Sequence, residues 1–262
     1  MSSAAQRVLL IDLGNTRVKW AWLSGAGNEL QGAGAAHTAS GLAGLPCLDR
    51  GKEVTGALAS NVAGIERGRK LAGLVRERLA VELVFVQAAP SACGVSVAYA
   101  NPLNLGADRW AALVGAHALG PDNYCIVDAG STVTMDLLLS DGRHLGGYIA
   151  PGREMSMAAM ARGTAELASR LKNQTGRPRD VAPGTDSAEA MEKGTLASQL
   201  GLIRFGMQRL ESQGQSAPVL LLTGGGADAL VATGQLPDAE VVPDLVLRGL
   251  AALAVELLPG PE

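Results

Sequence analysis

Two segments of this chain repeat one short pattern, and the repeat limits the folds that the chain can adopt. Residues 10–16 read LIDLGNT and residues 126–132 read IVDAGST. Each is an apolar strand ending in Asp, one further residue, Gly, a small polar residue and Thr, and each runs directly into a second strand. Asp12 and Asp128 are 128 − 12 = 116 positions apart, close to half of the 262 residues. The repeat predicts duplicated α/β domains that face a cleft, where ligands commonly bind; chance similarity between two Asp-Gly turns is the alternative.

Hydrophobic periodicity and turn residues divide the chain into strands and helices. Strands are expected over 7–13, 17–23, 29–37, 54–60, 81–86, 124–127, 133–139, 143–149 and 218–222. Helices are expected over 62–79, 106–119, most of 153–170, 187–212, a segment that begins at the glycines 224–226, and 244–258. Residues 91–105 look irregular. We place the domain boundary near Gly120-Pro121, with an N-terminal domain over 1–120 and a C-terminal domain over 121–262.

Composition excludes several classes of function. Lys and Arg total 22 against 25 Asp and Glu, so the net charge of −3 provides no basic field for nucleic acid. The three cysteines are far apart and form no C-x-x-C pair, which gives no support to a disulfide framework or a thiolate zinc site. The most apolar stretch, residues 245–258, is interrupted by Arg248 and Glu256 and is too short to span a bilayer. We therefore expect a cytoplasmic, soluble protein with no nucleic-acid partner and no membrane partner.

The first repeated turn carries groups that suit a nucleoside triphosphate. Gly14 lets a phosphate approach the main chain, and Asn15 and Thr16 add side-chain donors. Asp12 ends a buried strand and can hold Mg²⁺, while Lys19 can neutralise phosphate charge. Taken alone, the turn could equally be a plain hairpin with local hydrogen bonds. The second turn repeats the arrangement, so together the two turns predict a clamp on a polyphosphate.

A second group of candidates lies at the start of the helix expected after Leu105. Gly106, Ala107, Asp108 and Arg109 stand where a helix N-terminus offers N–H groups and a positive dipole end. Asp108 is a candidate general base beside a cation that orients an anionic substrate. A first-turn carboxylate with a surface partner is the structural alternative. The glycines of residues 146–152 and 223–226 are weaker signals, and the second set suits a flat ligand such as an adenine ring.

With these segments in order, the chain resembles the type III pantothenate kinases, of the actin and sugar-kinase superfamily. The resemblance spans nearly the whole length and rests on residues 12–19, 106–109, 128–132, 146–152 and 223–226. The D-x-G-N-T-x-x-K and G-x-D-R motifs at this spacing are specific to that family. The resemblance implies an α/β fold with duplicated RNase H-like domains, the actin-like ATPase fold, flanking a central cleft. It also implies ATP-dependent phosphorylation of pantothenate to 4'-phosphopantothenate, the first step towards coenzyme A.

The resemblance assigns roles residue by residue. Asp108 is implied as the catalytic base, Asp128 as a residue that helps hold K⁺ or NH₄⁺, and Ser131 as an ATP contact where the family usually has Thr. The implied ATP phosphate loop is Asp12, Leu13, Gly14, Asn15, Thr16, Arg17, Val18 and Lys19. The implied pantothenate contacts are Tyr99, Gly106, Ala107, Asp108, Arg109 and Ser187, with Thr185 as the competing choice for the last. Mg²⁺ is expected with ATP, and the family implies a homodimer in which the neighbouring subunit completes the pantothenate pocket.

Two alternative functions stay open on these residues. The first is another small-molecule kinase, or a phosphohydrolase, of the same fold, which would form ADP or phosphate without pantothenate. The second is a nucleotide-binding regulator that has lost catalysis. Retention of Asp12, Lys19 and Asp108 together argues against the regulator. The chain has no Ser-His-Asp order and no metal-hydrolase spacing, so phosphoryl transfer by positioning and charge neutralisation fits the residues best.

Overall fold

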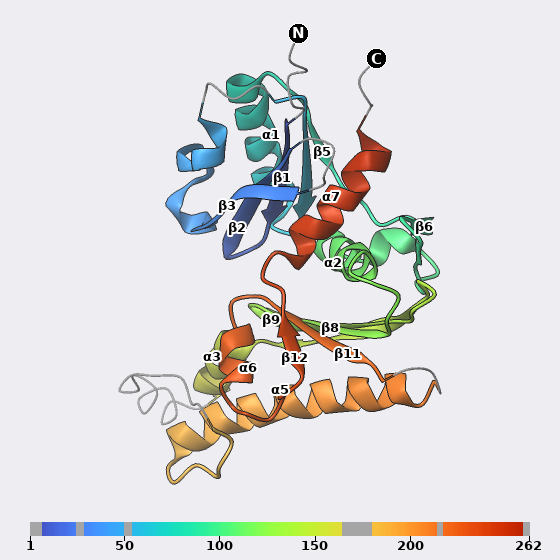
Figure 1. Ribbon diagram of the computed structural model, residues 1–262. Coiled ribbons are helices and arrows are strands. Elements are labelled where there is room, and N and C mark those ends of the chain that lie inside the picture. The colour runs from blue at the N-terminus through green and yellow to red at the C-terminus, as the bar shows by residue number, and fades with distance from the viewer. Residues whose placement is uncertain (1–6, 25–28, 50–53, 164–179, 214–216, 259–262) are drawn as a thin grey trace. The chain divides into compact units, whose positions relative to one another are not determined.

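The chain folds into two compact units. The computed structural model (Figure 1) describes residues 7–24, 29–49, 54–163, 180–213 and 217–258. The first unit comprises Met1–Pro121, Asp141–Arg143 and Asp244–Glu262, and the second comprises Asp122–Ser140 and His144–Pro243. The first break lies beside the boundary expected at Gly120-Pro121. The expectation of a continuous second domain over 121–262 is corrected here, because the last helix and the segment 141–143 pack with the first unit.

The two units contain sheets with the same strand order. The first sheet runs β3 (Glu29–His37), β2 (Arg17–Ser24), β1 (Arg7–Leu13), β4 (Gly56–Asn61) and β5 (Leu83–Phe85). The second runs β10 (His144–Pro151), β9 (Thr132–Leu138), β8 (Tyr124–Ala129), β11 (Val219–Thr223) and β12 (Ala239–Val241). In each sheet the first three strands pair antiparallel and the other two join in parallel. The structure therefore confirms the duplication that the repeated turns predict.

Helices connect and cover these strands. The first unit contains α1 (Ile65–Leu79), α2 (Ala107–His117) and α7 (Leu245–Leu257). The second contains α3 (Arg153–Gly163), α5 (Ser187–Glu211) and α6 (Ala227–Val231). The loop after β3 forms short 3₁₀ turns at Thr38–Ser40, Leu42–Gly44 and Pro46–Leu48. Residues 91–105, expected to be irregular, contain a small hairpin, β6 (Ser91–Ala92) with β7 (Val95–Ser96), and a 3₁₀ turn at Pro102–Asn104. The part of the 153–170 helix beyond residue 163 lies outside the described residues.

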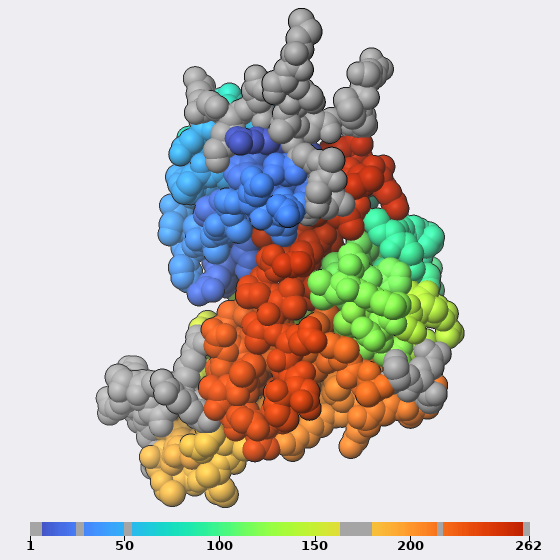
Figure 2. Space-filling view, viewed as in Figure 1, coloured from blue at the N-terminus to red at the C-terminus, as the bar shows by residue number. Residues whose placement is uncertain are grey.

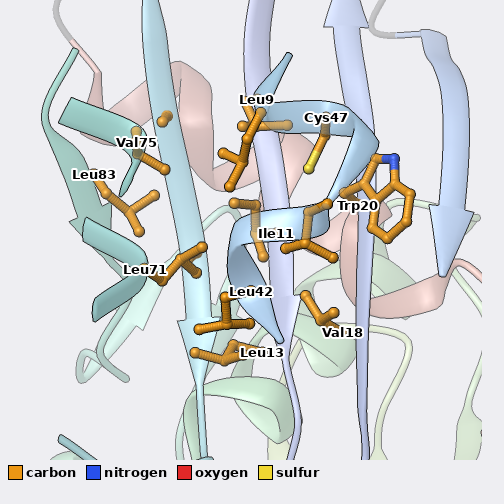
Figure 3. Close-up of a cluster of buried hydrophobic side chains, with 14 of the residues drawn as sticks. Leu9, Ile11, Leu13, Val18, Trp20, Leu42, Cys47, Leu71, Val75 and Leu83 are labelled. Atoms are coloured by element: carbon orange, nitrogen blue, oxygen red, sulfur yellow. The ribbon is translucent and has the colours of Figure 1, made fainter. Parts of the chain in front are cut away.

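Strand alternation builds the first core. Leu9, Ile11 and Leu13 of β1 are fully buried on one face of the sheet. Leu71 and Val75, one helical turn apart on α1, pack into the same cluster (Figure 3). The alternate β1 positions, among them Asp12, therefore point to the opposite face.

Helices α2 and α7 cover that opposite face, and they cross very closely. A Cβ on Gly249 would overlap the carbonyl oxygen of Ala111, and a Cβ on Gly115 would overlap that of Leu245. Glycine is therefore required at both positions of the crossing. Helix α7 also contacts β1 and β2, and the space-filling view shows its red residues beside the blue N-terminal strands (Figure 2). This packing explains why the C-terminal helix belongs to the first unit.

In the second unit, α5 covers one face of the sheet (Figure 1). Its residues Leu196, Leu200 and Ile203 are buried against Val127 and Met135 of the central strands. None of the described helices combines the length and the apolar character that crossing a membrane requires.

Candidate functional site

Three polar side chains form a row across one end of the first sheet. Asp12 on β1 is opposite Lys19 on β2 and in register with Ser60 on β4. Residues paired in this way present their side chains to the same face of a sheet. The hydroxyl of Ser60, which is fully buried, donates to Asp12 Oδ1 at 2.7 Å. The carboxylate is thus held between a hydroxyl donor and a cation.

The surroundings of Asp12 also define its electrostatics. Burial raises the pKa of Asp12, whereas the hydrogen bond from Ser60 and the charge of Lys19 lower it. The charge of Asp108 raises the same pKa, so the two carboxylates lie near enough to interact. Sequence reasoning missed Ser60, because nothing in its strand marks it; only the parallel register of β1 and β4 brings it beside Asp12.

The turn after β1 is fixed through its carbonyl groups. Gly14 O accepts from the Thr38 hydroxyl at 3.2 Å, and Thr16 O accepts from the Thr38 amide at 2.9 Å. Asn15 O accepts from the Arg67 guanidinium at 3.1 Å. Asn15 and Thr16 are exposed at the tip. The carbonyl oxygens of the turn are thus already bound within the protein. An anion requires hydrogen-bond donors and is repelled by exposed acceptors, so a turn of this kind suits an anion.

The predicted phosphate loop includes two residues whose side chains are placed in the core. Leu13 and Val18 are fully buried in the first hydrophobic cluster. Only their main-chain groups can therefore face a ligand. The side chains of Asp12 and Lys19 lie on the opposite face, with the row described above.

The start of α2 gathers the predicted substrate contacts. The amide of Arg109 donates to Asp108 Oδ1 at 2.8 Å. A Cβ on Gly106 would lie 2.7 Å from the same oxygen, so a larger residue would displace the carboxylate. Arg109 is only 7% exposed; its guanidinium donates to the Tyr99 hydroxyl at 3.1 Å and lies 5.8 Å from the ring centroid. Ala107 is the first residue of the helix. The structure thus brings these five residues together.

The second repeated turn is the counterpart of the first. Gly130 N donates to Thr132 O at 2.9 Å, as Gly14 N donates to Arg17 O at 3.0 Å. Thr132 therefore occupies the position in the second turn that Arg17 occupies in the first. The sequence repeat instead aligns Thr132 with Thr16. The second turn is one residue shorter, because Leu13 pairs with Val18 but Ala129 pairs with Val133.

Helix α3 supports this second turn. Gly152, just before the helix, donates its amide to Ser131 O at 3.1 Å, and a Cβ there would overlap the carbonyl oxygens of the turn. The next residue, Arg153, donates from Nε to Glu192 Oε2 of α5 at 2.7 Å, and a second bond joins the same two side chains. Glu192 is buried. The ion pair anchors α3, and through it the turn that carries Ser131.

We predict that Glu192→Gln lowers the free energy of unfolding by about 1–3 kcal/mol, because Arg153 loses a charged, largely buried partner. Each kcal/mol corresponds to a fall of about 2–4 °C in Tm for a chain of this size. Urea unfolding monitored by circular dichroism measures the change. Glu82→Gln, which breaks the exposed Arg76–Glu82 pair, is the matched control and should change stability by less than about 1 kcal/mol. Equal effects of the two variants would contradict the anchoring role of Glu192.

Ser187 is the first residue of α5, after the N-cap Asp186, whose side chain accepts from the amide of Glu189 at 2.8 Å. The competing Thr185 donates its hydroxyl to Glu189 Oε2 at 2.9 Å. A hydrogen bond from Lys193, with others from Thr185, holds the pKa of Glu189 at about 2. The Thr185 hydroxyl is thus bound to the side chain of a residue in the first turn of the helix.

Cys93 and Cys125 have raised pKa values, so neither is suited to covalent catalysis. Burial raises the pKa of Cys125 to about 12. Burial and the neighbouring Glu256 raise the pKa of Cys93 to about 11. Both thiols are therefore neutral near pH 7, and the reactive form would be the thiolate.

The two sheets of matching strand order and the helices that cover them define an actin-like α/β fold. Two solved structures share this fold along their length. A conserved Campylobacter jejuni protein, provisionally assigned to the Baf family of transcriptional activators, is 21% identical, with a TM-score of 0.58 and coverage of 95% of this chain and 98% of its own. A Sinorhizobium meliloti protein, provisionally assigned as a 2-dehydro-3-deoxygalactonokinase, is 15% identical, with a TM-score of 0.58 and coverage of 97% and 100%.

Sequence comparison identifies the family within this class. The family model described as type III pantothenate kinase matches residues 8–209. A type III pantothenate kinase of Burkholderia mallei (strain SAVP1) is 36% identical over 256 residues, covering 94% of this chain and 98% of the relative. The chain belongs to the type III pantothenate kinase family, and it is a kinase.

Proposed function

We propose that this chain transfers the γ-phosphoryl group of ATP to the primary hydroxyl of pantothenate, forming 4'-phosphopantothenate and ADP. The observation that carries the proposal is the group of charged residues in the first unit: the Lys19–Asp12–Ser60 row with Asp108 close enough to raise the pKa of Asp12. Two carboxylates beside a lysine suit a reaction that handles phosphate charge and one proton. The product would be the first intermediate on the way to coenzyme A.

The ATP phosphates would lie at the turn after β1. Main-chain and side-chain donors of residues 12–19 would bind phosphate oxygens, and Lys19 would neutralise their charge. Ser131, exposed on the second repeated turn, would supply a further ATP contact. Asp12 fits Mg²⁺, which in kinase sites commonly takes one or two carboxylates and completes its shell with phosphates and water. When bound, Mg²⁺ would supply charge neutralisation on the triphosphate.

The acceptor would be bound at the start of α2. The buried cation of Arg109, fixed by Tyr99, would pair with the pantothenate carboxylate, while Gly106 and Ala107 would line the site. Ser187 would be a further pantothenate contact, as the family resemblance implies. Asp108 would take the proton of the primary hydroxyl as the new O–P bond forms and ADP leaves. A carboxylate of ordinary basicity can accept this proton late in phosphoryl transfer.

Asp128 would help hold a monovalent cation, K⁺ or NH₄⁺. A Cβ on Gly224 would overlap both Asp128 Oδ1 and the carbonyl oxygen of Ala129, so both oxygens face that glycine. A carboxylate and a carbonyl oxygen are the ligand types that such cations accept.

A coupled assay of ADP formation tests the proposed function. ADP should form only when pantothenate is present, should require Mg²⁺ and should be stimulated by K⁺. ADP or phosphate formed at the same rate without pantothenate would indicate a different kinase or a phosphohydrolase. Nucleotide binding without turnover under every condition would indicate a regulator.

We further propose that the protein forms a homodimer and acts in the cytoplasm, where ATP is available. An apolar patch on the second unit supports the dimer: Leu145 and Tyr148 on β10, an edge strand, and Phe205 on α5 are all exposed. The rings of Tyr148 and Phe205 meet edge to face with centroids 5.7 Å apart. Exposed aromatic clusters of this kind commonly mark protein interfaces.

We predict that Phe205→Glu converts the dimer to a monomer, because a charge in the patch would be desolvated on association. Size-exclusion chromatography with light scattering measures the mass. Val255→Glu, at a residue 68% exposed on α7, is the control and should remain dimeric. A dimeric Phe205→Glu protein would exclude the patch as the interface.

A further inference from the structure

The row of polar residues in the first sheet has a counterpart in the second. Asp128 on β8 is opposite Thr134 on β9 and in register with Thr223 on β11. These positions correspond, strand by strand, to Asp12, Lys19 and Ser60 of the first sheet, whose strand order is the same. The sequence repeat alone hides the match, because the shorter second turn shifts the strand by one residue.

The two rows differ in the residues that flank the carboxylate. In the first row, Lys19 provides a positive charge and Ser60 donates a hydrogen bond to Asp12 at 2.7 Å. In the second, a threonine occupies the lysine position. Thr223 Oγ1 is buried, with the residue 1% exposed, and finds no hydrogen-bond partner among the described residues. A buried hydroxyl of this kind is costly unless something else binds it, such as an ion or a water molecule.

Two oxygen atoms lie close to the residue that follows Thr223 in the chain. Asp128 Oδ1 and the Ala129 carbonyl both face Gly224, the residue that follows Thr223. Gly224 has φ +86°, and a Cβ there would overlap both oxygens. Ala129 O accepts a hydrogen bond from Gly226 N at 2.8 Å, and a carbonyl oxygen has two lone pairs. These groups are oxygen acceptors, so they favour a cation over a phosphate.

We propose that Thr223 Oγ1 is an oxygen ligand of the monovalent cation held by Asp128. The inference rests on the cation role proposed for Asp128 above. One carboxylate among neutral oxygens suits a singly charged, weakly hydrated ion, whereas Mg²⁺ requires near-ideal octahedral geometry and retains its waters. The cation would take the place in the second sheet that the Lys19 ammonium takes in the first.

The test is a thermal-shift titration with KCl, with tetramethylammonium chloride keeping the ionic strength constant. Ligand binding to the folded state raises Tm, so the midpoint of the Tm rise reports K⁺ affinity without any turnover. Thr223→Val removes the hydroxyl at constant shape and should raise the K⁺ midpoint about tenfold, the effect of losing one modest ligand interaction. Thr223→Ser should restore the wild-type midpoint. Without K⁺, Thr223→Val should be at least as stable as the wild type, because an unpartnered buried hydroxyl is removed.

Controls separate this inference from the proposed site itself. Thr195→Val removes another buried hydroxyl of the second unit, one that donates to Met191 O at 2.9 Å, and should leave the K⁺ midpoint unchanged. An unchanged midpoint in Thr223→Val, with the response lost in Asp128→Asn, would overturn the role of Thr223 and retain Asp128. No K⁺ response in the wild type would overturn the cation site as a whole. If Thr223→Val does not fold, Thr223→Ala provides the same comparison with Thr223→Ser.

Discussion

Asp108→Asn is expected to lower kcat by about 10²–10⁴-fold, the usual contribution of a general base. The amide cannot take the proton of the acceptor hydroxyl, while its size and its hydrogen bond from the Arg109 amide can be preserved. The fold and ATP binding should therefore be retained. Steady-state ADP formation gives kcat, and titration with a non-hydrolysable ATP analogue gives the affinity.

The control for this variant is Asp228→Asn. Asp228 also lies in the first turn of a helix, α6, and is exposed. Its substitution should leave kcat within about twofold, as is usual for a surface change. Near-normal turnover by Asp108→Asn would show that another group accepts the proton.

Lys19→Gln is expected to lower kcat/KM for ATP by about 10²–10³-fold, a loss typical of one preorganised electrostatic group. Two effects combine: the triphosphate loses a positive charge, and Asp12 loses the cation that lowers its pKa. The acidic limb of the pH–rate profile should therefore move to higher pH. Rates measured across pH with varied ATP separate the two effects.

Lys70→Gln provides the matched charge change at an exposed residue of α1. It should leave both kcat/KM for ATP and the pH profile unchanged. If the Lys19→Gln enzyme had the same ATP dependence as the wild type, the phosphates would bind away from the Lys19–Asp12–Ser60 row.

Features with local signals could be predicted from the sequence. The Asp-Gly turns, the strands around them and the helix that starts next to Gly106 depend on residues close together in the chain. Strand β12, only three residues long and largely exposed at a sheet edge, has no comparable hydrophobic pattern and was missed. The return of α7 to the first unit was also missed, because it depends on the Gly115–Gly249 crossing between residues 134 positions apart (249 − 115 = 134).

The residues of the candidate site also divide into those with a local sequence signal and those without one. The positions of Asp12, Lys19 and Asp108 follow from motifs, but the partner that holds Asp12 does not. Ser60 becomes visible only through the register of a parallel strand, 48 residues away. Similarly, the match between Lys19 and Thr134 depends on a turn that is one residue shorter in the second sheet. Packing and register, rather than local preference, determine these contacts.

The most direct test of the proposed chemistry is analysis of the reaction product. Purified protein is incubated with ATP, Mg²⁺, K⁺ and pantothenate, and the products are examined by phosphorus–proton correlation NMR. One new phosphorus signal should couple to the methylene protons of the former primary alcohol, in an amount equal to the ADP formed. ADP accompanied only by inorganic phosphate, or phosphorus attached at any other position of pantothenate, would contradict the account.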